Sequence, residues 1–260
     1  MPALLRLEGL HKSFGVIRAV DGVSLRVARG EVLGFLGPNG AGKSTTMRMA
    51  AGFLAPDAGK VEVAGVDMWA EPVKAKAHLG YLPEGAPLYG EMTVRGFLKF
   101  CGRVRGLAGA ALKSAIEEAV ERTQLQAVLG QTIETLSKGF RRRTGLAQAI
   151  LHKPDVLILD EPTDGLDPNQ KHAVRRLIRE MAKDSAIIIS THILEEVPAV
   201  CDRVVIIAQG RVVADGTAQE LERMAPKEAR GSLEAVFRHL TLHGPAGGRE
   251  RVKSAREIVA

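Results

Sequence analysis

The chain has few of the residues that mark secreted, membrane-spanning or disulfide-bonded proteins. Its 260 residues include only two cysteines, Cys101 and Cys201, which excludes a disulfide framework and favours a reducing, cytosolic compartment. The apolar runs VLIL, AIIIS and VVIIA are far shorter than the roughly 18 residues that span a bilayer, and the opening residues MPALLRLEGLHK contain no long apolar signal core. We therefore expect a soluble protein that is not secreted.

Aromatic residues and excess charge are also scarce. Aromatic side chains make up 4% of the chain, so few platforms exist for stacking nucleobases. The formal net charge of +6 comes from 36 basic and 30 acidic residues, and this near balance predicts that most charges belong to solvated surface. A hydrophobic content of 45% is enough for one large core, in one domain or in a domain with a subdomain.

Two kinds of strand pattern alternate with helical patterns along the chain. Near the start, LLRLEGL, VSLRV and KVEVAG alternate apolar with polar residues, which predicts an antiparallel sheet. Farther on, short continuous apolar runs predict buried parallel strands. These runs cover residues 32–36, 156–159, 186–189 and 204–207. The combination predicts an α/β fold with a mostly parallel core sheet and an antiparallel β subdomain.

Helical periodicity without a strand pattern fills the chain between about residues 92 and 151, which predicts a helical insert. The last residues, HGPAGGRERVKSAREIVA, are charged and rich in Gly, a composition typical of flexible tails. We expect one domain over residues 1–242, with a helical subdomain at about 92–151, and a flexible tail over residues 243–260.

The strongest chemical signal is GPNGAGKST, which follows a predicted strand and opens a predicted helix, as a phosphate-binding P-loop does. Its residues are Gly37, Pro38, Asn39, Gly40, Ala41, Gly42, Lys43, Ser44 and Thr45. Glycines let successive N–H groups turn toward one point, and the helix N-terminus adds about half a positive charge there. We expect Lys43 to reach the β- and γ-phosphates of a nucleotide and Ser44 to bind Mg²⁺. A plain Gly-rich turn is the alternative.

Two adjacent carboxylates end the buried strand in VLILDEP. In an open α/β sheet, the carboxyl ends of the parallel strands lie together, and a phosphate loop that follows another strand lies at the same end. Asp160 is predicted to hold Mg²⁺, and Glu161 to orient or deprotonate an attacking water. His192 follows the strand AIIIS and is expected to hydrogen-bond the γ-phosphate or that water. A solvated acidic turn and a structural histidine are the alternatives.

A second helix start has anion-binding character, in TLSKGFRRRTGLAQAI. Ser137 and Gly139 precede an apolar helical pattern, and helix N-termini attract anions. Because the chain already has a complete phosphate loop, two such sites require two phosphates or two molecules. The arginines at 141–143 most simply cover a helix face; the alternative is that one reaches the nucleotide or interface carboxylates.

Together these motifs resemble the ATP-binding cassette (ABC) ATPases over residues 4–242. The family signature LSGGQ appears as LSKGF, and the order of phosphate loop, helical insert, LDEP, GLDP and STH also fits. The resemblance implies a P-loop fold of the ABC type and a head-to-tail dimer, in which Ser137 and Gly139 contact the ATP of the second chain. Lys138 and Phe140 depart from the family pattern, and Phe140 replaces a Gln that would contact the ribose.

The resemblance implies roles for three more residues. Phe14, in KSFG, stands where the family places the aromatic that stacks on adenine. Asp167, in GLDP, stands where the family has a dimer-interface aspartate. Glu84 replaces the usual Gln in the segment that links the nucleotide site to the transmembrane partner. A carboxylate there can bind Mg²⁺, but it also adds negative charge near the phosphates.

The function that the resemblance implies is the ATP-hydrolysing subunit of an exporter. LSKGFRRR, Glu84 and GSLEAVFRHLT are similar to the branch that includes gliding-motility, sodium, drug and lipid export ATPases, in which the permease is a separate chain. The implied cofactors are ATP and Mg²⁺. The implied partners are a second copy of the chain and an integral membrane permease, at the inner face of the cell membrane.

Two other classes fit less well. A cassette ATPase acting on nucleic acid or ribosomes would carry a long coiled coil or two sets of motifs, and this chain has neither. A GTPase would carry the guanine-reading motif NKxD, which does not occur.

Overall fold

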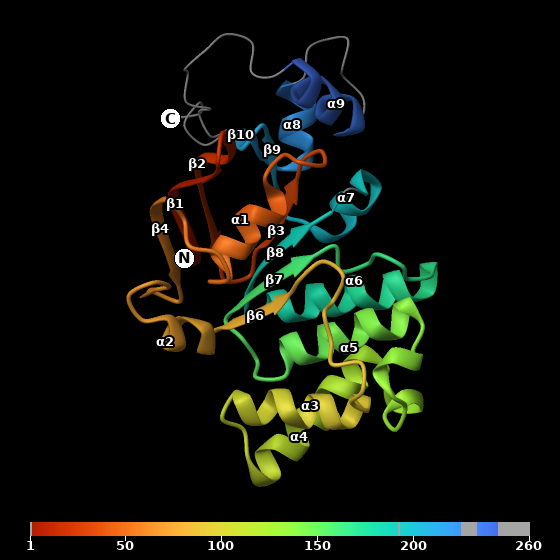
Figure 1. Cartoon of the computed structure of the whole chain (residues 1–260). Coiled ribbons are helices and arrows are strands. Elements are labelled where there is room, and N and C mark those ends of the chain that lie inside the picture. Colours follow the sequence, from red (N-terminus) through yellow and green to blue (C-terminus); the bar gives the residue numbers. More distant parts are fainter. Residues whose placement is uncertain (1, 192, 225–232, 244–260) are drawn as a thin grey trace.

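The computed structural model describes residues 2–191, 193–224 and 233–243 (Figure 1). The strands are β1 (Ala3–Phe14), β2 (Ile17–Ala28), β3 (Val32–Leu36), β4 (Ala58–Val63), β5 (Val66–Asp67), β6 (Leu79–Leu82), β7 (Val156–Asp160), β8 (Ala186–Ser190), β9 (Arg203–Ala208) and β10 (Arg211–Gly216). The α-helices are α1 (Lys43–Ala50), α2 (Pro72–Ala77), α3 (Val94–Val104), α4 (Gly109–Thr123), α5 (Lys138–Ile150), α6 (Pro168–Ala182), α7 (Val197–Val200), α8 (Ala218–Met224) and α9 (Leu233–His243). Short 3-10 turns cover Gln126–Val128, Ile133–Thr135 and Leu194–Glu196.

The larger sheet has six strands in the order β10-β9-β3-β8-β7-β6. All neighbours in it are parallel except β10, which pairs antiparallel with β9. Strands β3, β7 and β8 are buried at every residue, as continuous apolar runs covered on both faces must be. The four buried strands that the sequence predicts are confirmed to within one residue at each end.

The smaller sheet has four antiparallel strands in the order β2-β1-β4-β5. Alternating side chains, including Leu5, Leu7, Val61 and Val63, are buried against the rest of the molecule. The predicted antiparallel region is therefore confirmed, since its polar residues take the other face.

Two strands of the larger sheet escaped the sequence analysis. Strand β6 is only four residues long and contains Gly80, and β10 ends in Ala214, Asp215 and Gly216. Neither has the continuous apolar run that revealed the other strands. Both lie at the edges of the sheet, where β6 pairs with β7 and β10 with β9.

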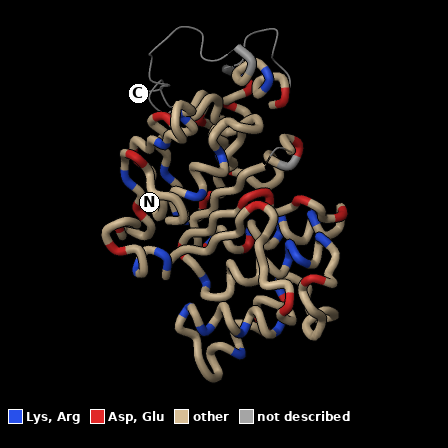
Figure 2. The backbone as a smooth tube through the Cα atoms, in the orientation of Figure 1, with Lys and Arg blue, Asp and Glu red and all other residues tan. Residues whose placement is uncertain are grey.

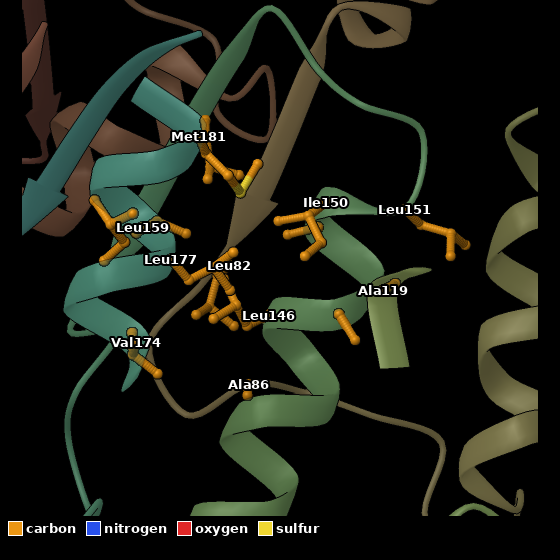
Figure 3. Packing of buried hydrophobic residues seen from close by; sticks show 14 of the residues in the cluster. Leu82, Ala86, Ala119, Leu146, Ile150, Leu151, Leu159, Val174, Leu177 and Met181 are labelled. Atoms are coloured by element: carbon orange, nitrogen blue, oxygen red, sulfur yellow. The ribbon is translucent and has the colours of Figure 1, made fainter. Parts of the chain in front are cut away.

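Hydrophobic cores fill both faces of the larger sheet. Helix α1 and the smaller sheet cover one face, and α5 and α6 cover the other. Figure 3 shows the second core, where Leu146 of α5 and Leu177 of α6 pack with Leu82 and Leu159 of the sheet. Helices α3, α4 and α5 follow one another between β6 and β7 (Figure 1). The predicted α/β fold with a parallel core sheet, an antiparallel region and a helical insert is confirmed.

The outer edge of β6 is covered by side chains of the α5 region instead of another strand. Gln148 Nε2 donates to Tyr81 O at 2.9 Å, and His152 Nε2 lies 3.1 Å from Leu79 O. Unpaired strand edges need such cover, because a buried carbonyl without a donor is costly. The edge strand is thereby fastened to α5.

The described residues contain no helix long and apolar enough to cross a bilayer. The predicted flexible tail, residues 243–260, lies outside the described residues except for His243, where α9 ends.

Candidate nucleotide site

The predicted phosphate loop lies between β3 and α1. Gly37 packs so closely on Ile207 O that a Cβ atom would clash, and Gly42, with φ 103°, packs as closely on Ala19 O. Only glycine fits these two positions. The loop is thus held between β9 and the start of β2, next to the β1–β2 turn, while residues 38–40 are exposed.

The lysine of the loop is the first residue of α1. Lys43 is 9% exposed, and its Nζ donates to Gly37 O at 2.6 Å and to Pro38 O at 3.1 Å. Ser44 and Thr45 follow in the first turn and are partly exposed. Main-chain carbonyls therefore hold the ammonium group inside the loop, where an anion would meet it.

Three predicted carboxylates lie close enough to act on this lysine. Burial lowers the pKa of Lys43, and the negative charges of Glu161, Asp160 and Glu84 oppose that effect. Asp160 ends β7 and Glu161 follows it, while Glu84 is exposed two residues after β6. Figure 2 shows acidic residues at the bend after β7. The structure therefore brings Lys43, Asp160, Glu161 and Glu84 together beyond the carboxyl ends of the parallel strands β3, β6 and β7.

The end of β7 has an unusual backbone. Glu161 has φ 55°, a left-handed conformation that costs a non-glycine residue on the order of 1–3 kcal/mol. Its N–H donates to Ser190, at 3.1 Å to Oγ and 3.2 Å to the carbonyl oxygen. The Ser190 hydroxyl in turn donates to the carboxylate of Asp160, which is 2% exposed. His192 lies outside the described residues.

The second anion-binding pattern begins α5. Ser137 is the N-cap of this helix, and its Oγ accepts a hydrogen bond from Phe140 N at 3.3 Å. Gly139 is buried beside Leu166. Within the described residues, no hydrogen bond joins Ser137 or Gly139 to the phosphate loop of the same chain.

The two residues that depart from the family signature have partners in their own chain. Lys138 Nζ lies 2.8 Å from Asp164 Oδ2, and both side chains are largely exposed. The Phe140 ring lies 4.3 Å from the guanidinium carbon of Arg143. Lys138 therefore ties the signature to the segment after β7, whereas Phe140 packs on α5 itself.

The prediction that the arginines at 141–143 cover a helix face is wrong for two of them. Arg141 is exposed, but Arg142 and Arg143 are only 5% and 6% exposed. Leu146 and Ala149 follow Arg142 at i+4 and i+7, so the three residues lie on one buried face of α5. This spacing is the signal in the sequence that could have predicted the burial of Arg142. Both buried arginines donate to main-chain carbonyls.

Phe14 and Asp167 lie in different surroundings. Phe14, at the end of β1, is 51% exposed, and Lys12 Nζ lies 5.8 Å from its ring centroid. Asp167 is the N-cap of α6 and accepts from Gln170 N at 2.9 Å. The Phe14 ring is thus available for stacking, while the Asp167 carboxylate already has a structural role.

The donor set fits Mg²⁺ in a nucleotide site. Ser44 offers a hydroxyl and Asp160 a carboxylate, and both are hard oxygen donors. Within the described residues, His, Cys, Asp and Glu form no group of three or more that could hold a metal. Mg²⁺ needs only one or two protein ligands where phosphates and waters supply the others.

A cavity of about 360 Å³ lies elsewhere, with Arg122, Lys153, Asp155 and Glu180 among its lining residues. None of the predicted site residues lines it. The predicted nucleotide site is thus distinct from this cavity, and its phosphate loop is exposed at residues 38–40.

The site has the parts of a P-loop nucleotide-binding cassette. They are a glycine-rich loop at the start of α1, carboxylates at the end of β7, and a second anion-binding pattern at the start of α5. The family model described as "ABC transporter" matches residues 20–164. The chain belongs to the ABC transporter family.

Known relatives include exporter subunits. The Nod factor export ATP-binding protein I of Paraburkholderia xenovorans is 38% identical over 220 residues, which cover 84% of this chain and 72% of the relative. The probable multidrug ABC transporter ATP-binding protein YbhF of Escherichia coli is 37% identical over 237 residues. This match covers 90% of the chain but 41% of YbhF, so the chain spans less than half of that relative's length.

Among solved structures, the ATP-binding subunit of an ABC transporter superposes with a TM-score of 0.84 and 31% identity. The superposition covers 91% of this chain and 99% of that one. The ABC-type fold predicted from the motifs is confirmed.

Proposed function

We propose that this chain is the ATP-binding and ATP-hydrolysing subunit of a membrane exporter, and that two copies pair head to tail on a separate permease. The observation that carries the proposal is the unequal surroundings of two helix starts. At α1, Lys43 lies close to Asp160, Glu161 and Glu84. At α5, Ser137 is exposed, caps the helix, and within the described residues has no hydrogen bond to the phosphate loop of its own chain.

Each residue of the α1 site has a proposed task. Lys43 and the backbone N–H groups of residues 39–45 bind the β- and γ-phosphates, and Ser44 and Asp160 hold Mg²⁺. The bound ion neutralises charge on the phosphates. Glu161 orients the attacking water and accepts its proton, which is effective because its backbone is fixed by Ser190.

Three further residues complete the site in this proposal. Phe14 stacks on adenine, Glu84 contributes a ligand to Mg²⁺, and His192 hydrogen-bonds the γ-phosphate or the water. The exposure of the Phe14 ring supports the first role. The influence of Glu84 on Lys43 supports the second. The role of His192 rests on its place after β8 in the sequence.

The second chain supplies the rest of each site. Ser137 Oγ and Gly139 N–H contact the γ-phosphate bound to the partner's loop, where hydrogen-bond donors aimed at developing charge lower the barrier. Asp167 lies at the dimer interface. The exposure of residues 38–40 of the phosphate loop supports this arrangement, because a second molecule can cover a nucleotide bound there and exclude water.

The surface after Glu84 supports binding to a permease. Tyr89, Phe100 and Val104 are 60%, 40% and 70% exposed, and the Tyr89 and Phe100 rings meet edge to face with centroids 5.6 Å apart. Exposed aromatic clusters mark interaction sites. The relatives named above are exporters or multidrug transporter subunits by name, which favours export over a nucleic-acid function.

The remaining features of the proposal follow from the motifs. The ABC ATPase domain covers residues 1–242, with its helical subdomain at about 92–151 and a flexible tail at 243–260. The chain lies on the inner face of the cell membrane, held there by the permease.

A mixing experiment tests the composite site. Ser137→Arg should bind ATP through its own loop but fail to hydrolyse it, and Lys43→Ala should fail because its loop lacks the phosphate charge. Titrating one variant into the other, with permease-containing membranes present, should restore one working site in each mixed dimer. Turnover that rises and then falls with the mixing ratio supports the proposal, whereas full activity of Ser137→Arg alone contradicts it.

A further inference from the structure

Arg142 of α5 joins the ends of two neighbouring strands. Its Nη1 donates to Pro83 O at 2.9 Å, just beyond β6. Its Nη2 donates to the main-chain oxygens of Asp160 and Glu161, at the end of β7. A side chain that is 5% exposed therefore bridges the two segments that carry the predicted carboxylates.

The contacts at β7 fix the backbone of one residue. Asp160 O belongs to the peptide group before the Cα atom of Glu161, and Glu161 O belongs to the peptide group after it. One NH₂ group of Arg142 holds both, so it restrains both φ and ψ of Glu161. Glu161 has φ 55°, and such a conformation persists only where its surroundings determine it. The direction of the Glu161 side chain therefore depends on Arg142.

The contact at β6 acts on the other carboxylate. Pro83 O belongs to the peptide group that leads into Glu84, and it accepts from Ala86 N at 3.1 Å as well as from Arg142. The same guanidinium group thus sets the position of both Glu84 and Glu161. A planar fork of donors suits this task better than a single ammonium group.

Charge adds to the geometry. Burial lowers the pKa of Arg142, and the carboxylates of Asp160, Asp164, Glu161 and Glu84 oppose that effect. The cation therefore lies among four negative charges and reduces their mutual repulsion.

We infer that Arg142 is a positioning residue for ATP hydrolysis: through main-chain hydrogen bonds it holds Glu161 and Glu84 where they can act on water and Mg²⁺. The inference rests on the proposed function of this site. Arg142 is buried and its guanidinium group donates to three main-chain oxygens, so its loss should impair the chemical step more than ATP binding.

The next residue provides a matched control. Arg143 is on the same helix, 6% exposed, and lacks a partner for its Nε atom within the described residues, as Arg142 does. Its Nη1 donates to Gln124 O at 3.0 Å and Thr123 O at 3.4 Å, at the end of α4. Replacing either arginine removes a buried cation and its carbonyl contacts, but only Arg142 contacts the strand ends at the site.

The experiment compares Arg142→Gln with Arg143→Gln. Both should lower the urea midpoint of unfolding. Arg142→Gln alone should lower kcat by about tenfold or more while the KM for ATP stays within about twofold, because a misplaced catalytic group slows chemistry without weakening phosphate binding. Normal kcat in Arg142→Gln, or an equal loss in Arg143→Gln, overturns the inference.

Arg142→Lys covers the case in which Arg142→Gln does not fold. It keeps the charge but not the planar fork, so kcat should fall by about threefold or more. Turnover equal to that of the unchanged protein overturns the inference.

A double variant separates positioning from a general structural effect. If Arg142 acts through Glu161, adding Arg142→Gln to Glu161→Gln should leave the residual single-turnover rate almost unchanged. If Arg142→Gln lowers the rate of Glu161→Gln by the same factor as it lowers the rate of the unchanged protein, the inference is overturned. Failure of the proposed function gives a different result, since Glu161→Gln alone would then keep its turnover. An inactive Glu161→Gln beside a fully active Arg142→Gln contradicts only the role of Arg142.

Discussion

Two helices of this molecule begin with an anion-binding pattern, and their first turns differ in what surrounds them. At α1, Lys43 folds back onto the loop carbonyls, with Glu161, Asp160 and Glu84 close enough to influence it. At α5, Ser137 caps its own helix, and the adjacent Lys138 pairs with Asp164.

The difference shows that a helix start alone does not make a catalytic site. A helix N-terminus attracts anions in either place, but the α1 start also has Lys43 under the influence of three carboxylates. Within the described residues, no hydrogen bond joins Ser137 or Gly139 to the phosphate loop of the same chain, so the proposal assigns them to a nucleotide bound by a second chain. Arg142, within α5, is the point at which the two regions meet.

The largest expected effect concerns Glu161, the proposed base of the α1 site. Glu161→Gln should bind ATP but hydrolyse it about a hundredfold or more slowly, because the amide cannot accept the proton of the water. It should accumulate as an ATP-bound dimer, measured by size-exclusion chromatography beside a phosphate-release assay.

Glu180→Gln is the matched control, since Glu180 is an exposed glutamate on α6. Its turnover should equal that of the unchanged protein. Near-normal turnover in Glu161→Gln would remove Glu161 from the proposed role and leave α1 as a binding site only.

The second prediction compares two lysines that are each the first residue of their helix, Lys43 of α1 and Lys138 of α5. Lys43→Ala should reduce ATP affinity and turnover by about a hundredfold, because a buried charge at the phosphates is lost. Lys138→Ala should change both by less than about threefold, because its exposed ion pair with Asp164 contributes little. Fluorescent-nucleotide binding and phosphate release measure the two effects. A larger loss in Lys138→Ala would reverse the assignment of the two helix starts.

The sequence predicted the α1 region well because its features are local. Glycines, a lysine and an apolar strand stand in one continuous stretch, and each buried strand of the core is a continuous apolar run. The fold class and the gathering of Lys43, Asp160 and Glu161 followed from these signals, whereas Glu84 was added through the resemblance to the family. The roles of these residues in the reaction stay predictions.

The α5 region was predicted less well because its contacts are distant in sequence. Arg142 lies 59 residues from Pro83 and 19 from Glu161, and its burial depends on the strand ends that meet it in the fold. Three adjacent arginines suggest a solvated face, since charged residues are rarely buried. Strand β6 was missed for a related reason: its own sequence is too short to reveal it, and its outer edge is held by Gln148 of α5 and by His152, just after α5.

The smallest expected effect tests how α5 is held on β6. Burial lowers the pKa of His152 to about 4, and its Nε2 lies 3.1 Å from Leu79 O. The folded chain then binds fewer protons than the unfolded chain between about pH 4 and pH 6.5. The contribution of His152 to the free energy of unfolding is therefore fully present above about pH 6.5 and is lost as the pH falls through this window. The contribution of His152 should fall by about 2 kcal/mol between about pH 7.5 and pH 5.

His152→Gln keeps a donor for Leu79 O without a titrating group, so its urea midpoint should depend less steeply on pH than that of the unchanged protein. Equal pH dependence in the two proteins would show that the protonation of His152 is not coupled to unfolding.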